Sequence, residues 1–193
     1  QAPFLATPAR PGTSLSPTGH VGGDGSGDIS HDSVIPSTTA PWLSPEAQAL
    51  TQLLLSSYQG AFAHPLLICD QGGPFQRTAA QELFASPIAV LAHDHSADPL
   101  LTYANRTALR IWGHRWQTMV GMPSRLTAEQ SARRERASAL QQAQQRAGFR
   151  GYSGIRINQK GRRFMIHNAR IWPLRNDNNE VCGQAAAFSN WWW

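Results

Sequence analysis

The segment His93-Asp94-His95 contains the residue types best suited to metal chemistry, with Asp98 close behind it. Two histidines separated by one residue share a face of a strand end, where their imidazole nitrogens could bind zinc. The alternative is a solvated turn, in which Asp94 or Asp98 accepts hydrogen bonds from nearby backbone N–H groups. Pro99 keeps the residue before it out of helical geometry, which favours the turn. We therefore predict turn residues here and no metal site.

Residues that could support catalysis or nucleic-acid binding do not form a convincing pattern. The sequence has no nucleophile–base pairing and no carboxylate pair, and Gly22-Gly23-Asp24-Gly25 lacks the flanking strand and helix that a phosphate-binding loop requires. The stretch Arg133–Arg136 could contact nucleic-acid phosphates, but Glu135 interrupts it and no aromatic residue accompanies it. We predict that the protein is not an enzyme and does not bind nucleic acid directly.

The elements that position these residues are organised around Ser86–Gly113. Ser86–Ala92 is a short apolar run typical of a buried strand, and Leu100–Tyr103 regains strand character after the polar turn. Asn105 stands where a helix N-cap belongs, because its side-chain oxygen can accept a hydrogen bond from a backbone N–H of the first turn. The segment therefore predicts strand, turn, strand and a capped helix that Gly113 can end.

The remaining elements follow from hydrophobic spacing, caps and turns. The alternation in 149–158 places Phe149, Ile155 and Ile157 on one side of a strand and Arg150, Tyr152 and Arg156 on the other. Five antiparallel strands with helices on one face give an α+β fold. The other predicted elements are helices from Ser44 to about Gly60, Thr78–Ala85, Trp116–Val120 and Thr127–Ala147, and strands Arg162–Leu174 and Val181–Phe188.

Composition separates a tail from a domain. Residues 1–43 are rich in Pro, Gly, Ser and Thr, which predicts an extended, disordered-type tail, followed by a domain at 44–190 and a tryptophan-rich end at 191–193. The chain begins with Gln, which suggests a removed targeting segment or a partial sequence. No apolar run approaches the ~20 residues of a membrane span.

Charge is unevenly distributed along the chain. The net charge is +5, and Lys160 is the only lysine, so the positive charge is nearly all arginine. Arginine suits carboxylate or phosphate partners, but the arginines are scattered rather than clustered, which favours codon usage as the explanation.

Several stretches resemble the MEKHLA family, a PAS-like group, over roughly Leu50–Phe188. They are LLLSSY, SPIAVLAHD, DPLLTYANRTALRIW, MPSRLTAE, RRERASAL, GFRGYSGIRINQKGRRFMIHNARIWPL and GQAAAF, and they occur in the family's order. The hexapeptide that names the family is absent. In plants the domain ends class III homeodomain–leucine zipper proteins, but no homeodomain or zipper occurs here, so the chain is more similar to stand-alone algal or cyanobacterial versions.

The resemblance implies a ligand pocket between the sheet and the helices. Candidate lining residues are Tyr103, Leu109, Trp112, Ile155, Ile157, Phe164 and Trp172. Such side chains suit a flat cofactor, for example a flavin or a tetrapyrrole, but the favoured alternative is that they simply fill the core.

The sequence does not require any cofactor. Neither Cys69 nor Cys182 lies in the GxNCRFLQ-like helix that flavin photochemistry of the light-oxygen-voltage type needs, and a disulfide between them stays open. His114 or His167 could act as an axial ligand of haem, although a lone histidine is usually structural.

We expect a sensory, regulatory or protein-interaction module. The alternative is a structural or linker subunit of a large assembly, such as a photosynthetic plastid complex, held by the N-terminal tail and the C-terminus. The candidate contacts are Pro41, Trp42, Trp191, Trp192 and Trp193. The expected location is soluble, in a plastid if the source is algal and otherwise in the cytoplasm, with association with a membrane complex left open.

Overall fold

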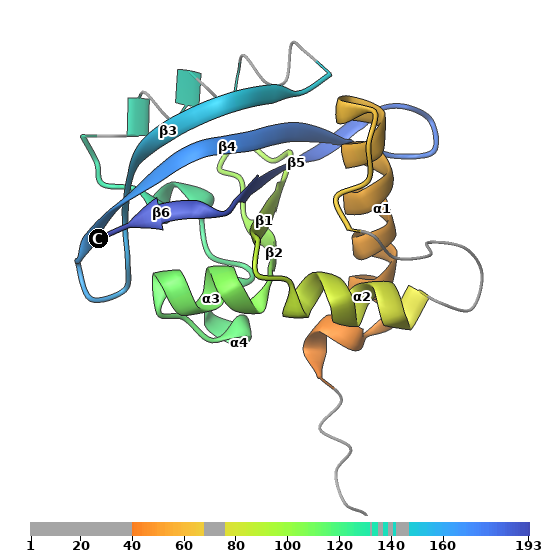
Figure 1. Cartoon of the computed structure of the whole chain (residues 1–193), viewed down its shortest axis with the longest axis horizontal. Coiled ribbons are helices and arrows are strands. Elements are labelled where there is room, and N and C mark those ends of the chain that lie inside the picture. The colour runs from red at the N-terminus through yellow and green to blue at the C-terminus, as the bar shows by residue number, and fades with distance from the viewer. Residues whose placement is uncertain (1–39, 68–75, 132, 135–136, 139–140, 142–146) are drawn as a thin grey trace, which may run out of the picture. The chain divides into compact units, whose positions relative to one another are not determined.

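The computed structural model describes residues 40–67, 76–131, 133–134, 137–138, 141 and 147–193, arranged as a sheet with helices around it (Figure 1). The helices are η1 (Pro41–Leu43), α1 (Pro45–Phe62), α2 (Gln76–Ala85), α3 (Arg106–Trp112), α4 (Trp116–Met119) and η3 (Ser124–Thr127). The strands are β1 (Ala89–Asp94), β2 (Leu101–Ala104), β3 (Phe149–Ile157), β4 (Arg163–Arg175), β5 (Val181–Phe188) and β6 (Asn190–Trp192).

The sheet has the order β2-β1-β5-β4-β3, and the pairings between these neighbouring strands are antiparallel. The short strand β6 pairs with the same strand, β4, as β5 does. Ala187 lies opposite Arg170 and Asn190 lies opposite His167, so β6 continues the register of β5 along β4. The tryptophans of β6 therefore extend the last strand of the sheet.

One face of the sheet, called the outer face here, packs against α1. Ser44 caps this helix by accepting a hydrogen bond from the Ala47 N–H at 3.2 Å. Trp172 of β4 donates its indole N–H to the Leu54 carbonyl, and its ring meets the Tyr58 ring edge-on at 4.9 Å. These side chains belong to a buried cluster that also contains Leu55, Phe62, Val90, Tyr103, Leu174 and Ala187.

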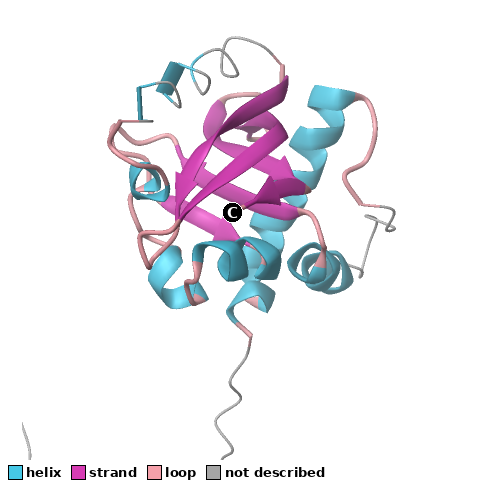
Figure 2. Ribbon diagram, turned by 60° about the vertical axis from the view of Figure 1, so that its left-hand side comes forward, coloured by secondary structure: helices cyan, strands magenta, loops and turns pink. Residues whose placement is uncertain are grey.

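The opposite, inner face packs against α3 and the segments that follow it. Its buried cluster includes Leu109 and Trp112 from α3, Tyr152 from β3 and Phe188 from β5. Alternate residues of β1 and β5 enter the two clusters, as strand geometry requires. The predicted α+β fold is confirmed, and α1 adds a second covered face, so helices lie on both sides of the sheet (Figure 2).

The bounds of β1 differ from the sequence prediction at both ends. His93 and Asp94, predicted as turn residues, are the last residues of β1, because they pair with Gln184 and Gly183 of β5. The start of β1 is correspondingly later, at Ala89. The helix predicted over Thr127–Ala147 lies largely outside the described residues, and Thr127 itself ends η3.

Candidate functional site

A cavity lies on the inner face of the sheet, against α3 and η3. Its volume is about 50 Å³. Most of its wall is apolar, and its polar lining comes from β1, η3, β3 and β5. The polar or hydroxyl-bearing lining residues are His93, Thr127, Tyr152, Arg156 and Gln184, and the apolar ones are Leu91, Ala92, Leu101, Trp112, Ile166, Ala169, Ile171, Ala185, Ala186 and Phe188.

Asn105 fixes the helix that forms one wall of this cavity. Its side-chain oxygen accepts hydrogen bonds from the N–H groups of Ala108, at 3.1 Å, and Val90, at 3.0 Å. Its amide donates to backbone carbonyls of Leu83, Ser86 and Ile88. The predicted N-cap is confirmed, and the same side chain ties α2, β1 and α3 together in a fully buried position.

Trp112, at the end of α3, links the cavity to η3. Its indole N–H donates to the Thr127 carbonyl at 3.2 Å, and its ring meets Phe164 edge-on at 5.0 Å. Because both Trp112 and Thr127 line the cavity, a molecule inside it would touch the contact that joins these two elements.

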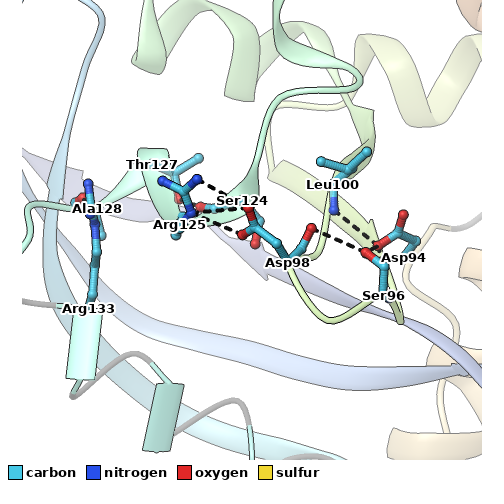
Figure 3. A network of polar contacts seen from close by, with 9 residues as sticks. All are labelled: Asp94, Ser96, Asp98, Leu100, Ser124, Arg125, Thr127, Ala128 and Arg133. Carbon is cyan, nitrogen blue, oxygen red and sulfur yellow. Dashed lines mark hydrogen bonds and ion pairs between the residues drawn. The ribbon is translucent and has the colours of Figure 1, made fainter.

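The β1–β2 turn holds η3 in place through a network that Figure 3 shows. Arg125 donates from Nε to both carboxylate oxygens of Asp98, at 3.0 and 3.2 Å, and from Nη2 to one of them at 3.1 Å. The Asp94 carboxylate accepts bonds from the Ser96 hydroxyl and the Leu100 N–H. The Ser96 hydroxyl is the main reason that the pKa of Asp94 lies below its usual value.

Tyr152, Gly154 and Arg156 form the β3 part of the wall. Arg156 donates from Nη2 to the Tyr152 hydroxyl and from Nη1 to the Ile155 carbonyl, both at 2.7 Å. A Cβ atom at Gly154 would lie 2.5 Å from the Tyr152 hydroxyl oxygen and 3.2 Å from Arg156 Nη1. Gly154 therefore leaves the space in which the two longer side chains meet.

Of the seven predicted pocket residues, the structure places only Trp112 on the cavity. Leu109 and Phe164 pack in the inner cluster beside it, whereas Tyr103 and Trp172 belong to the cluster under α1. Burial raises the pKa of the Tyr103 hydroxyl, since the charged form would lose its hydration.

The predicted grouping of residues on the two faces of β3 changes along the strand, because the register shifts between Phe149 and Gly154 and Phe149 packs on the inner side with Tyr152. Tyr152 and Arg156 are buried on the inner face, whereas Ile155 and Ile157 are only partly buried and alternate with them. Ile155 lies instead beside Met165 and Trp192 in a shallow hollow on the outer side. The prediction placed isoleucine inside on hydrophobicity alone, while the inner face accommodates an arginine next to a cavity.

The predicted interaction residues lie in two places. Trp42 of η1 stacks on Phe84 with ring centroids 3.6 Å apart, and Pro41 begins the same turn. Trp191 is partly buried against the inner cluster. Trp192 and Trp193 are 53% and 46% exposed, and the Arg162 guanidinium lies 4.3 Å from the Trp193 ring centroid.

Metal and haem ligands are not gathered at the cavity. Within the described residues, no group of three His, Cys, Asp or Glu side chains is placed to hold a metal ion. His114 and His167 do not line the cavity. Burial lowers the pKa of His114, and His167 contacts the Ser153 hydroxyl at 3.0 Å. Cys182 is a free thiol, and Cys69 lies outside the described residues.

The sequence matches the MEKHLA domain family over residues 48–193, which is most of its length. The chain belongs to the MEKHLA domain family. No curated protein matches it. The algal or cyanobacterial subtype stays a prediction.

Solved structures place this MEKHLA domain among PAS folds. The crystal structure of a PAS domain of a Colwellia psychrerythraea protein superposes with a TM-score of 0.52 at 13% identity, covering 57% of this chain and 92% of that one. The structure of an RNA-binding light-oxygen-voltage receptor superposes with a TM-score of 0.50 at 17% identity. The match covers 64% of this chain and 36% of the receptor chain. At these identities the likeness shows the fold alone.

No helix in the described residues is long and apolar enough to span a membrane. Of the lining residues, only Trp112 was predicted; the polar ones that the sequence prediction did not include are Tyr152, Arg156, His93, Gln184 and Thr127. For Tyr152 and Arg156 the signal was the Tyr-x-Gly-x-Arg spacing within YSGIRI, which puts three residues on one face of a strand.

Proposed function

We propose that this MEKHLA domain is a non-enzymatic sensory or regulatory module that responds to a small molecule bound in the inner cavity. The observation that carries the proposal is the cavity itself. It lies between the sheet and α3 and combines apolar walls with a few buried polar groups, which is the usual character of a small-molecule site.

The contacts around the cavity provide a route for the response. Trp112 is bonded to Thr127 of η3, and η3 is held by Arg125 on Asp98 of the β1–β2 turn. A ligand that moves Trp112 would change the position of η3 and of the chain that follows it. The volume of about 50 Å³ is far below the roughly 300 Å³ or more of typical cofactor pockets, so the proposed ligand is much smaller than a flavin or a tetrapyrrole.

A thermal-shift screen of small metabolites against the full chain tests this function. Compounds that raise the Tm of the wild type should lose the effect in Ala186→Leu, which fills the cavity from β5. Ala49→Leu, the same substitution at an exposed position of α1, serves as the control. Equal stabilisation of Ala186→Leu and wild type by every hit would contradict the proposal, as would a screen without hits.

A second candidate function is that of a structural subunit or linker in a larger assembly, such as a photosynthetic plastid complex. The exposed rings of Trp192 and Trp193, beside Ile155 and Met165, favour it, because large exposed apolar side chains often mark contacts between proteins. Deleting residues 1–43 tests the predicted role of the tail. A truncated chain that still co-purifies with its complex at full stoichiometry would rule that role out.

A further inference from the structure

Arg156 is a buried cation without an acidic partner in the described part of the chain. Its residue exposure is 6%. Its bonds go to the Tyr152 hydroxyl and the Ile155 carbonyl, both neutral groups, and the guanidinium has more N–H donors than these. The ion pairs among the described residues are Arg125 with Asp98 and Arg163 with Glu129. Buried arginines are ordinarily paired with a carboxylate, so this one calls for an explanation.

The position of Arg156 on the cavity wall supplies that explanation. A guanidinium presents its donors in a planar fork that matches a carboxylate with two parallel hydrogen bonds. The Tyr152 hydroxyl accepts a hydrogen bond from Nη2 and so fixes the fork on one side, and the missing side chain at Gly154 makes room for this contact. An anion in the cavity would therefore neutralise a charge that the described residues leave unpaired.

The rest of the cavity restricts the kind of anion. The volume of about 50 Å³ has room for roughly four water-sized groups. Inorganic phosphate would need donors around all its oxygens, but ten of the fifteen lining residues are apolar. A ligand with one anionic end and a short hydrocarbon end satisfies both the arginine and the apolar wall.

We infer that the cavity binds a short monocarboxylate, of about the size of acetate or propionate, through Arg156. The carboxylate accepts hydrogen bonds from the guanidinium, and the alkyl group contacts apolar wall residues such as Trp112, Ile171 and Phe188. This inference rests on the proposed function, because it names the ligand class of the same cavity.

Isothermal titration calorimetry of the full chain tests the inference, with propionate and its neutral counterpart propionamide as probes at constant chloride. Propionate should bind to the wild type. The Arg156→Gln substitution should lower the affinity for propionate about tenfold or more, because a hydrogen bond between charged groups is lost. Arg110→Gln, at an exposed position of α3, should leave the affinity unchanged. Gly154→Ala should weaken propionate while circular dichroism shows an intact fold, since the new methyl group displaces the Tyr152 and Arg156 side-chain ends.

The outcomes separate this inference from the proposed function. If propionamide binds as tightly as propionate and Arg156→Gln changes neither, the cavity is a ligand site but not a carboxylate site. Inorganic phosphate binding in preference to propionate would also overturn the inference. If Arg156→Gln does not fold, the wild type remains decisive, because the NMR signal of the Arg156 Nε–H must shift on adding propionate but not propionamide. An unmoved signal overturns the inference.

Discussion

The two faces of the sheet are covered in different ways. On the outer face, α1 and β4 interlock through Trp172, Tyr58 and Leu54, and these side chains are fully buried. On the inner face, α3 and η3 leave a cavity and a buried arginine. A protein shaped by stability alone would fill such a hole and avoid such a charge. The outer face therefore contributes close packing, and the inner face holds the cavity to which we assign the proposed function.

The largest expected effect comes from removing the centre of the outer packing. Trp172→Ala should lower the free energy of unfolding by about 3–5 kcal/mol, through lost burial and an unfilled cavity. Urea unfolding measures the change. Trp192→Ala, at the exposed end of the sheet, is the control and should stay within about 0.5 kcal/mol of wild type. Similar losses in the two variants would contradict the role given to α1.

Two neighbouring alanines of β5 compare the two faces directly. Ala187 lies in the cluster under α1, and Ala186 lines the cavity. Ala187→Val should cost about 1–3 kcal/mol because the packed side has no room for added methyl groups. Ala186→Val should cost less than about 0.5 kcal/mol, because its methyl groups enter existing space. Chemical denaturation of both variants measures the two losses of unfolding free energy. Equal losses would show that the cavity beside Ala186 cannot accommodate added methyl groups.

Replacing the buried Arg156 should raise the stability of the domain, whereas the substitutions above lower it. Arg156→Met should make the ligand-free domain more stable by about 1 kcal/mol, since an apolar side chain replaces a cation that lacks a carboxylate. The same variant should lose propionate binding. Thermal unfolding with and without propionate measures both effects. A destabilised Arg156→Met would mean that the arginine serves structure rather than function.

The smallest expected effect is a pH dependence in the β1–β2 turn. The pKa of Asp94 is lowered in the folded state, so its contribution to stability is present above its unfolded pKa of about 3.9 and is lost as pH falls through the folded value. Wild type should therefore lose more stability than Asp94→Asn between about pH 5 and pH 3. Parallel unfolding curves for the two proteins across this range would contradict the network in Figure 3.

The sequence predicted the fold well because the fold depends on local signals. Asn105, Gly113 and the Ser44-Pro45 pair mark helix ends through backbone hydrogen bonding, and each cap is found where it was predicted. The predicted first and last residues of β5, Val181 and Phe188, are those found in the structure. These features depend on near neighbours in the chain.

Of the predicted pocket residues only Trp112 lines the cavity, because the cavity wall depends on contacts between distant elements. Hydrophobicity alone favoured Ile155 and Ile157 over Tyr152 and Arg156, and the burial of an arginine becomes visible only when β3 is placed against β4 and η3. Trp172 is a large aromatic residue of the kind that often lines a pocket. Its position in β4, however, places its side chain on the outer face, against α1. The pattern of apolar residues in β4 does not show which of its two faces packs closely against helices and which borders a cavity.

A crystal structure of the full chain grown with propionate tests the central claim most directly, namely that the inner cavity is a carboxylate site built on Arg156. The account predicts propionate inside the cavity, with both carboxylate oxygens within hydrogen-bond distance of the Arg156 guanidinium and the alkyl group against Trp112. A structure in which propionate lies only on the surface, while Arg156 pairs with a carboxylate of the chain itself, would contradict it.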